Sequence, residues 1–433
     1  MDPVSLGYLG VVVLVLLIVI GLPVAFSSAI VGVAGLMVMR NFDVAIGLAG
    51  MVPYATSASY SFSVLPLFIA IGFFALYGGI THGAFESARL WVGRLPGGLA
   101  TATVFAAAAF GAVSGASTAT AAVFTKLALP EMEARGYSRV LATGVIAVGG
   151  TLAALIPPSA LLVIYGIIVD TSIARLLIAG LIPGILSAVV YAIVIFVVVK
   201  RNPALAPRMD PVPMLMKLRS LTKVWSVVAV VGVIIGGVYF GWMTPTESAS
   251  IGTAIVFGLA LARRVSFAEL KQSLLETIKT TAMIFMVIWG VMIFVRFLAF
   301  TGMPDSLTES IVAMNLSPTM VVILVIILYL FLGMILDGLG MMMLTLPVIY
   351  PAMMALGFDP VWFGVLVIKM VEIGLVTPPV GMNCYVVNGV RPDIPLETIF
   401  RGVMPFLVGE IFIVGILVTF PEVVLYLPNK MFN

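Results

Sequence analysis

Four short stretches of this sequence combine polar side chains with helix-breaking residues inside apolar surroundings. Two are rich in small residues, at positions 114–118 and 333–340, and two are the motifs Pro157-Pro158 and Pro378-Pro379. Hydroxyl, carboxylate and backbone carbonyl oxygens suit Na⁺, whereas the free N–H groups of a helix N-terminus suit a carboxylate. The chemistry that these residues favour is therefore the binding of a small cation next to an organic anion.

The first small-residue stretch lies in the middle of a segment, 97–133, that we predict to be a re-entrant hairpin. Its arms consist largely of Ala, Gly, Ser and Thr, which allow two antiparallel helices to pack closely. Its turn is formed by Ser114, Gly115, Ala116, Ser117 and Thr118. Ser and Thr hydroxyls also join membrane helices by hydrogen bonds, and taken alone the stretch favours that structural interpretation.

The second stretch predicts another hairpin, 317–356, whose break contains Gly333, Asp337, Gly338 and Gly340. Asp337 lies deep in apolar sequence, and an acid in that setting is by default an ion ligand or a proton carrier. The alternative is that Asp337 caps the returning helix. The two interpretations are compatible, because a capping carboxylate can also bind a cation.

The Pro-Pro motifs interrupt two long apolar segments, 138–168 and 360–389. Proline lacks an N–H and clashes with the preceding turn, so two in succession should unwind a helix and free its carbonyl groups. The half-helix ends would then point at a shared cavity. The flanking residues are Gly149, Gly150, Thr151 and Ser159 at the first break, and Glu372, Gly374, Thr377 and Asn383 at the second.

A few charged residues also lie within apolar segments. Lys369 and Glu372 are spaced i,i+3 and can neutralise each other, although Glu372 also opens the second unwound motif and can support the site. Glu410 is interpreted as structural. Arg296 is interpreted as snorkelling to the interface or pairing inside the protein, in preference to meeting a substrate carboxylate.

The composition indicates what class of protein holds these stretches. Of the 433 residues, 62% are hydrophobic and 9% are charged, compared with about 25% charged in ordinary soluble domains. A soluble enzyme, a nucleic-acid-binding protein and a disordered chain are thereby excluded. The single cysteine, Cys384, excludes an intramolecular disulfide, and the single histidine, His82, excludes the usual multi-His metal sites. We predict an all-α polytopic membrane protein whose first apolar segment is a mature helix and not a cleaved signal.

The sequence contains one structural unit twice. LIPPSALLVIYG recurs as LVTPPVGMNCYV, and at the same offset LPEMEARGYSRV recurs as YPAMMALGFDPV. Each half has about five crossing helices, one of them the Pro-Pro-broken helix, and one re-entrant hairpin. Because the number of crossings is odd, the second half must be inverted relative to the first. We predict inverted repeats at 1–199 and 224–433, joined by a linker at 200–223, which is the architecture typical of secondary transporters.

The distribution of charge predicts the orientation in the membrane. The linker is rich in basic residues and has one acid, Asp210, so the positive-inside rule makes it cytoplasmic. The odd number of crossings then places both termini on the opposite, outer side of the membrane. Residues 44–58 and 265–280 fall at matching places in the two halves, and we predict that both form interfacial arm helices.

Several stretches together resemble the large membrane (DctM-type) subunit of tripartite ATP-independent periplasmic (TRAP) transporters. They are SGAST, LIPPSALLVIYGIIVDTSIARLLIAGLIPG, EIGLVTPPVGMNCYV and FPEVVLYLP, and the resemblance covers essentially the whole chain. It implies an elevator-type transporter, in which scaffold and transport domains draw on both repeats. It also implies an organic-acid substrate, Na⁺ as coupling ion and a location in the bacterial inner membrane, so that both termini would be periplasmic. The implied partners are a small four-helix membrane subunit and a periplasmic substrate-binding protein.

The resemblance also implies roles for particular residues. One Na⁺ site would be built by Ser114, Ser117, Gly149, Gly150 and Pro157, and its inverted counterpart by Gly333, Asp337, Gly338, Gly374, Thr377 and Pro378. The substrate carboxylate would contact Ser117, Thr118, Thr377 and Asn383.

Other functions are also compatible with parts of this sequence. A stand-alone divalent-anion/Na⁺ symporter of similar fold and an H⁺-coupled version of the importer need the same elements; Na⁺ is favoured because oxygen-rich tips outnumber buried titratable groups. A serine protease at Ser117 would need a base, but His82 lies near a helix end and Lys126 is nine residues away. The sequence has neither a repeated pore ring nor a nucleotide-binding loop. We therefore predict a transporter with no enzymatic activity.

Overall fold

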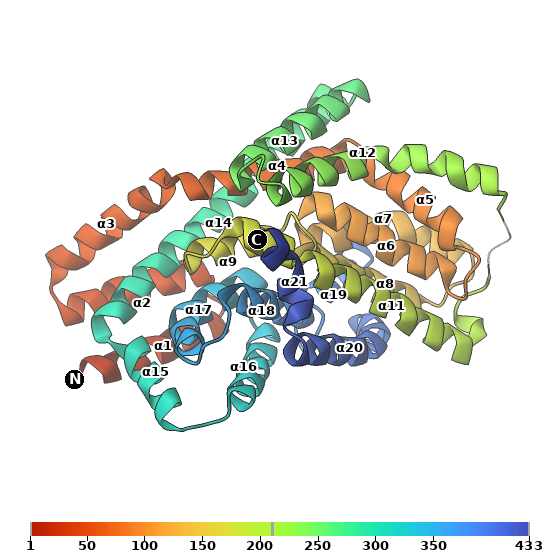
Figure 1. The fold of residues 1–433 in the computed structure, drawn as a ribbon. Coiled ribbons are helices and arrows are strands. Elements are labelled where there is room, and N and C mark those ends of the chain that lie inside the picture. The colour runs from red at the N-terminus through yellow and green to blue at the C-terminus, as the bar shows by residue number, and fades with distance from the viewer. Residues whose placement is uncertain (1, 209–211, 432–433) are drawn as a thin grey trace.

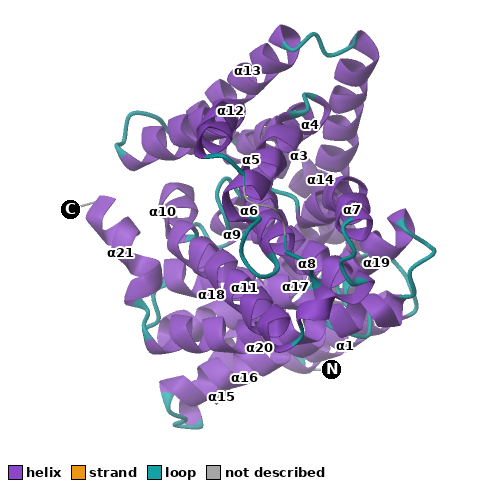
Figure 2. Ribbon diagram, turned by 90° about the vertical axis from the view of Figure 1, so that its right-hand side faces the viewer, coloured by secondary structure: helices purple, strands orange, loops and turns teal. Residues whose placement is uncertain are grey.

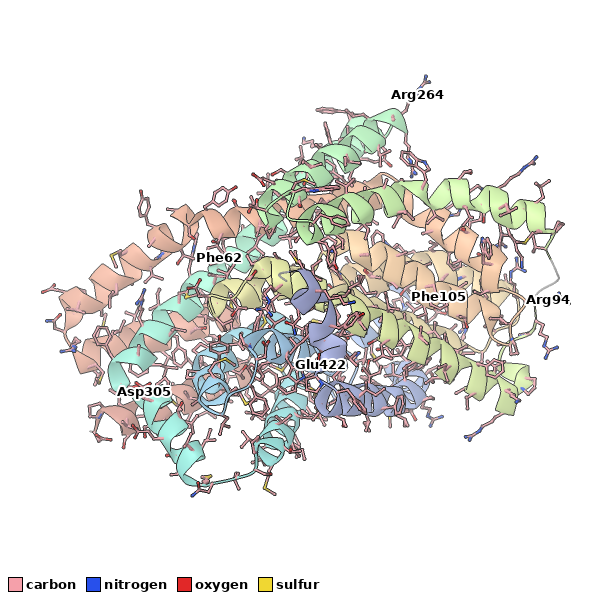
Figure 3. All side chains as sticks on the ribbon, viewed as in Figure 1. Phe62, Arg94, Phe105, Arg264, Asp305 and Glu422 are labelled. Carbon is pink, nitrogen blue, oxygen red and sulfur yellow. The ribbon has the colours of Figure 1, made fainter. Side chains whose placement is uncertain are left out.

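The computed structural model describes residues 2–208 and 212–431, except for the side chains of residues 80 and 81, and contains helices but no strand in that part of the chain. Seven helical segments there are long and apolar enough to cross a membrane, judged by length and composition. Charged side chains at helix ends, such as those of Arg94 and Arg264, project from the edges of the molecule (Figure 3). The prediction of an all-α polytopic membrane protein is confirmed.

The helices of the first half are listed here in chain order. They are α1 (Pro3–Val19), α2 (Val24–Met39), α3 (Phe42–Ala58), η1 (Tyr60–Ser63), α4 (Val64–Tyr77), α5 (Ile80–Val92), α6 (Gly98–Ser114), α7 (Ser117–Ala134), α8 (Arg139–Thr151), η2 (Leu152–Ala154), α9 (Ala160–Ile168), α10 (Ile173–Ala179), α11 (Leu181–Arg201) and η3 (Pro203–Leu205).

The second half follows the same order. Its helices are α12 (Met214–Tyr239), α13 (Pro245–Ala262), α14 (Phe267–Thr301), α15 (Met303–Ala313), α16 (Pro318–Gly333), α17 (Gly338–Ala355), α18 (Pro360–Gly374), α19 (Met382–Val390), α20 (Leu396–Thr419) and α21 (Glu422–Met431).

Both predicted hairpins and both predicted breaks are present. The hairpins are α6–α7 and α16–α17, and the broken helices are α8–α9 and α18–α19. In each broken helix the backbone leaves the helical path at the Pro-Pro motif, and the peptide bonds Pro157-Pro158 and Pro378-Pro379 are cis. Helices α8 and α18 end at Thr151 and Gly374, shortly before these motifs, where two successive prolines remove two N–H donors and clash with the preceding turn.

The helices form two packed groups. In one, which we call the frame (α1–α4 and α12–α14), α14 packs along α2 and α4, and α13 packs along α4 and α12. In the other, which we call the carrier (α6–α11 and α16–α21), α8 lies against α6, α7 and α20, and α18 lies against α16 and α17. Figures 1 and 2 show α12 and α13 together at one side of the molecule and α16 and α20 at the opposite side.

Two helices bridge the frame and the carrier. α5 packs against α6 of the carrier and α12 of the frame, and α15 packs against α17 of the carrier and α1 of the frame. They occupy equivalent positions in the two halves, since α5 follows α4 and α15 follows α14. The duplication is therefore visible in the connections as well as in the hairpins.

Two boundaries differ from the sequence predictions. Residues 265–280 do not form a separate arm, because α14 runs unbroken over 35 residues from a capping box between Ser266 and Glu269, with no proline in its path. In the first half, residues 44–58 do belong to a separate helix, α3, which ends before the short turn η1. Helix α12 begins at Met214, inside the predicted linker.

Small residues let the carrier helices approach closely. A Cβ added to Gly402 of α20 would lie 2.0 Å from the carbonyl oxygen of Val140 and 3.0 Å from the Cα of Gly144. Such distances are too short for any side chain, so glycine is required where α20 crosses α8.

Candidate functional site

The first hairpin tip is held against the first Pro-Pro break. Gly115 has φ 61°, a left-handed conformation that ends α6 and lets α7 start at Ser117. A Cβ on Gly115 would lie 2.9 Å from the carbonyl oxygen of Pro158, so the tip touches the unwound backbone directly. Ser114 and Thr120 hydroxyls are 3.1 Å apart across the turn. The N-terminus of α7 has no side-chain cap, so its first N–H groups are available to a ligand.

The first break brings several of the predicted residues together. A Cβ on Gly150 would lie 2.9 Å from the carbonyl oxygen of Ser117 and 3.1 Å from Nδ2 of Asn383. Ser159 is fully buried; its hydroxyl donates to the carbonyl of Ala154 and accepts from the N–H of Leu162 at 3.3 Å. Ser159 therefore serves as the cap of α9.

The second tip lies against the second break in the same way. A Cβ on Gly333 would lie 2.9 Å from the Cα of Gly374, so the two backbones touch. A Cβ on Gly338 would lie 2.2 Å from a methyl group of Val371. Asp337 caps α17 by accepting the N–H of Gly340 at 3.1 Å on Oδ2. The capping role of Asp337 is confirmed, and the side chain also lines the cavity described below.

The second break is tied to the first across the repeat interface. Asn383 donates from Nδ2 to the carbonyl of Ala147 at 3.0 Å, and its N–H donates to the carbonyl of Leu375 at 2.9 Å. Its Oδ1 is buried and has no hydrogen-bond partner in the described part of the chain. The Thr377 hydroxyl donates to the carbonyl of Ile373 at 2.6 Å. The two breaks therefore meet behind the tips, as expected of paired half-helices.

A cavity of about 900 Å³ lies between the two tips and the frame. Its walls come from the tip residues 115–118 and 335–339, from α9, from the α1–α2 corner at 21–26 and from one face of α14. Of the four residues predicted to contact the substrate, Ser117 and Thr118 line this cavity, whereas Thr377 and Asn383 lie buried outside its lining. Two of the four residues thus border the cavity, and the other two make hydrogen bonds to the backbone behind it.

One charged residue of the cavity was not singled out by sequence reasoning. Asp337 and Lys279 are the charged residues in its lining, within the part of the chain that the structure describes. Lys279 lies where the polar first half of α14 gives way to its apolar second half. That change of composition was the available signal, but it did not indicate which face of the helix meets the tips.

Some of the residues predicted as Na⁺ ligands lie close to one another within each half. Ser117 and Gly150 approach each other at the first tip, and Gly333 and Gly374 approach each other at the second. Both groups supply hydroxyl or carbonyl oxygens, which suit a hard cation such as Na⁺. The structure thus assembles tip and break within each half.

A buried charge cluster lies behind the site. Lys369 is fully buried, and its Nζ is 2.8 Å from Glu372 Oε2, 2.7 Å from Glu410 Oε2 and 2.9 Å from the Ser187 hydroxyl. Tyr191 donates to Glu410, so α11, α18 and α20 meet at this point. The predicted pairing of Lys369 with Glu372 is present, and Glu410 completes it.

Charges at one end of the carrier form a partly exposed network. Arg391 lies 2.9 Å from Glu133 and 2.7 Å from Asp393 and so connects α7 to the loop before α20. The hydrogen bond from Arg391 lowers the pKa of Asp393 to about 2. Arg296, in contrast, is exposed on α14, which favours the snorkelling interpretation.

Comparison with known proteins gives a consistent result. Residues 11–423 match the family described as "Tripartite ATP-independent periplasmic transporter, DctM component". The chain is 34% identical to the C4-dicarboxylate TRAP transporter large permease protein DctM of Pseudomonas aeruginosa, over 87% of this chain and 88% of that protein. It is 31% identical to the sialic acid TRAP transporter large permease protein SiaM of Vibrio cholerae, over 98% and 97% of the two chains.

A solved structure shares the fold. The YdaH transporter of Alcanivorax borkumensis, described as having an unusual topology, superposes with a TM-score of 0.54 over 83% of this chain and 84% of that one, at 14% sequence identity. At that identity the similarity is one of fold alone.

Proposed function

Because the chain belongs to the DctM component family of TRAP transporters, we propose that it imports an organic acid driven by a Na⁺ gradient. Membership of this family makes it a transporter subunit and not an enzyme. The observation that carries the proposal is the cavity that both hairpin tips line. On one side of it α7 starts without a side-chain cap, which suits a carboxylate, and on the other side stands the carboxylate of Asp337, which suits a cation.

Na⁺ coupling is supported by the oxygen atoms that the tips and breaks bring together. Asn383 Oδ1 is buried without a hydrogen-bond partner in the described residues, and burying such an oxygen is costly unless something binds it. It belongs to the side chain whose Nδ2 lies next to Gly150, one of the predicted ligands at the first break. The donor set of hydroxyl, amide and carbonyl oxygens therefore fits Na⁺ as a co-transported ion.

An elevator mechanism is supported by the division into frame and carrier. The carrier holds both tips and both breaks, so a rigid movement of this group would carry the site as one unit. The frame supplies the opposite wall of the cavity through α14 and the α1–α2 corner. α5 and α15 bridge the two groups and are placed to act as hinged connections.

The proposed orientation places the linker at 200–223 in the cytoplasm and both termini in the periplasm of a bacterial inner membrane. Basic residues outnumber the single acid of the linker, which supports this assignment. The polar start of α14 then lies on the cytoplasmic side, and the cavity beside it faces inward. The chain would work with a small four-helix membrane subunit and a periplasmic substrate-binding protein.

Reconstitution into proteoliposomes tests the coupling ion. Radiolabelled succinate and sialic acid serve as probes, with the small subunit and the binding protein added or omitted. An inward Na⁺ gradient without a pH gradient is expected to drive uptake of one of these acids, and collapse of that gradient to abolish it. Undiminished uptake on a pH gradient alone would refute Na⁺ coupling. Uptake that needs no binding protein would instead favour a stand-alone Na⁺ symporter of similar fold.

A further inference from the structure

Lys279 places a positive charge on the frame wall of the cavity. The residues of α14 that line the cavity include Lys279, Met283 and Met286, which the helical repeat puts on one face. The Lys279 side chain is 67% exposed, and its Nζ is 3.3 Å from Glu276 one turn earlier. That carboxylate oxygen also accepts a hydrogen bond from Gln272 at 2.8 Å. An exposed pair of this kind is weak, so the ammonium group is free to exchange Glu276 for another anion.

The helix that carries Lys279 is fixed to the frame. A Cβ on Gly290 would lie 2.0 Å from the carbonyl oxygen of Ala25, and a Cβ on Gly32 would lie 2.8 Å from the backbone nitrogen of Phe294. These close backbone contacts lock α14 to α2. Ser117, Thr118 and Asp337, in contrast, belong to the hairpins of the carrier.

We propose that Lys279 is an anion-binding residue of the frame, which takes an acidic group of the substrate that the hairpin tips do not hold. The inference rests on the proposed function, because the anion that Lys279 binds is the transported organic acid. It adds a substrate class, because an acid with two anionic groups could contact the α7 N-terminus and Lys279 together, whereas a monoacid could contact only one of them. The contact is also specific to one position of the carrier, since it exists only while the hairpin tips face this stretch of α14.

Thiol labelling inside the cavity tests the charge directly. In the full-length chain a cysteine replaces Ala282, which lines the cavity one turn from Lys279. The native Cys384 is buried, so labelling of the chain without the introduced cysteine gives the background rate. The measured quantity is the ratio of labelling rates for an anionic and a cationic methanethiosulfonate reagent. Lys279→Gln is expected to lower this ratio about threefold or more, because it removes the nearest positive charge.

Matched variants separate this effect from a general change in charge or folding. Lys271→Gln removes a charge from the same helix two turns away, outside the cavity lining, and is expected to leave the ratio unchanged. Lys279→Arg keeps the charge and is expected to restore the ratio. An unchanged ratio in Lys279→Gln, or an equal fall in Lys271→Gln, overturns the proposal.

Succinate identifies the ligand chemistry. Added succinate is expected to slow labelling of the cysteine at 282 in the parent and in Lys279→Arg, and to slow it by less than half as much in Lys279→Gln. Equal protection in Lys279→Gln, or no protection in any variant, contradicts a carboxylate contact at Lys279. Succinate protection that depends on Lys279, in the absence of any Na⁺-driven uptake, would support the anion site and refute the proposed function. The anion site and the proposed function can therefore fail separately.

Discussion

Single residues at the two hairpin tips leave different groups free for a ligand. The N-terminus of α7 has no side-chain cap, whereas α17 is capped by Asp337. One tip therefore presents N–H groups and the other a carboxylate, although both descend from the same repeated unit. The duplication has produced two similar backbones with opposite chemical preferences.

Asp337 is predicted to combine a structural and a functional role. Asp337→Asn retains an oxygen that can accept the Gly340 N–H, and so is expected to keep stability while weakening the Na⁺ dependence of uptake. Asp337→Ala loses the cap as well and is expected to lower the free energy of unfolding by about 1 kcal/mol. Thermal unfolding and uptake at graded Na⁺ concentrations measure the two effects. An unaltered Na⁺ dependence in Asp337→Asn would show that the carboxylate only caps the helix.

Lys369 is predicted to be essential because it compensates two buried carboxylates. Lys369→Met leaves Glu372 and Glu410 without their cation and is expected to cost about 3–5 kcal/mol of unfolding free energy. The triple variant Lys369→Met/Glu372→Gln/Glu410→Gln removes all three charges and is expected to recover much of that loss. Melting temperatures in detergent compare the two. Equal melting temperatures would mean that packing, and not charge, accounts for the effect.

Among the elements, the crossing of α8 and α20 is predicted to depend on glycine. Gly402→Ala is expected to destabilise the protein by about 1–3 kcal/mol, because its Cβ would overlap the backbone of α8. Gly415 lies on the same helix with open space around its Cα, so Gly415→Ala is the matched control and is expected to be neutral or mildly stabilising. The melting temperatures of Gly402→Ala and Gly415→Ala, each compared with the parent protein, test this prediction. A similar fall for both variants would assign the effect to α20 itself.

The elements that could be predicted well from the sequence are those whose ends are determined by nearby residues. The two hairpins and the two breaks could be predicted because glycine and proline stop helices within a few residues. The contacts that complete the site were less accessible, since they join distant segments. Asn383 bonds to Ala147 only through the packing of α19 against α8, and Glu410 reaches Lys369 only through the packing of α20 against α18. Lys279 was missed for the same reason, because its role depends on which face of α14 the carrier meets.

At the scale of the whole molecule, the frame and the carrier approach each other closely at the first hairpin tip. Gly72 of α4 in the frame touches the first tip, where an added Cβ would lie 2.7 Å from the carbonyl oxygen of Ser114. A larger residue there would disfavour this arrangement without touching the interior of either group. The population of this arrangement should then fall in favour of others.

Gly72→Val is predicted to shift the molecule away from the arrangement described here. At a cost of about 1–3 kcal/mol, its population relative to alternatives would fall about fivefold or more. Labelling of a cysteine at 282 by a neutral reagent is expected to slow accordingly. Gly258→Val, on α13 of the frame with open space around it, is the control and should label normally. Unchanged labelling in Gly72→Val would mean that α4 yields to the new side chain.

The unbroken length of α14 affects how the frame is oriented in the bilayer. At 1.5 Å per residue its 35 residues span about 52 Å, well over the roughly 30 Å of hydrocarbon in a bilayer. A helix this long must lie oblique or extend through the headgroups, and its angle then responds to the thickness of the surrounding lipid. We therefore expect the height of Lys279 relative to the hairpin tips to change with acyl-chain length. Bilayer thickness is then expected to alter the distance between the frame wall and the tip wall of the cavity.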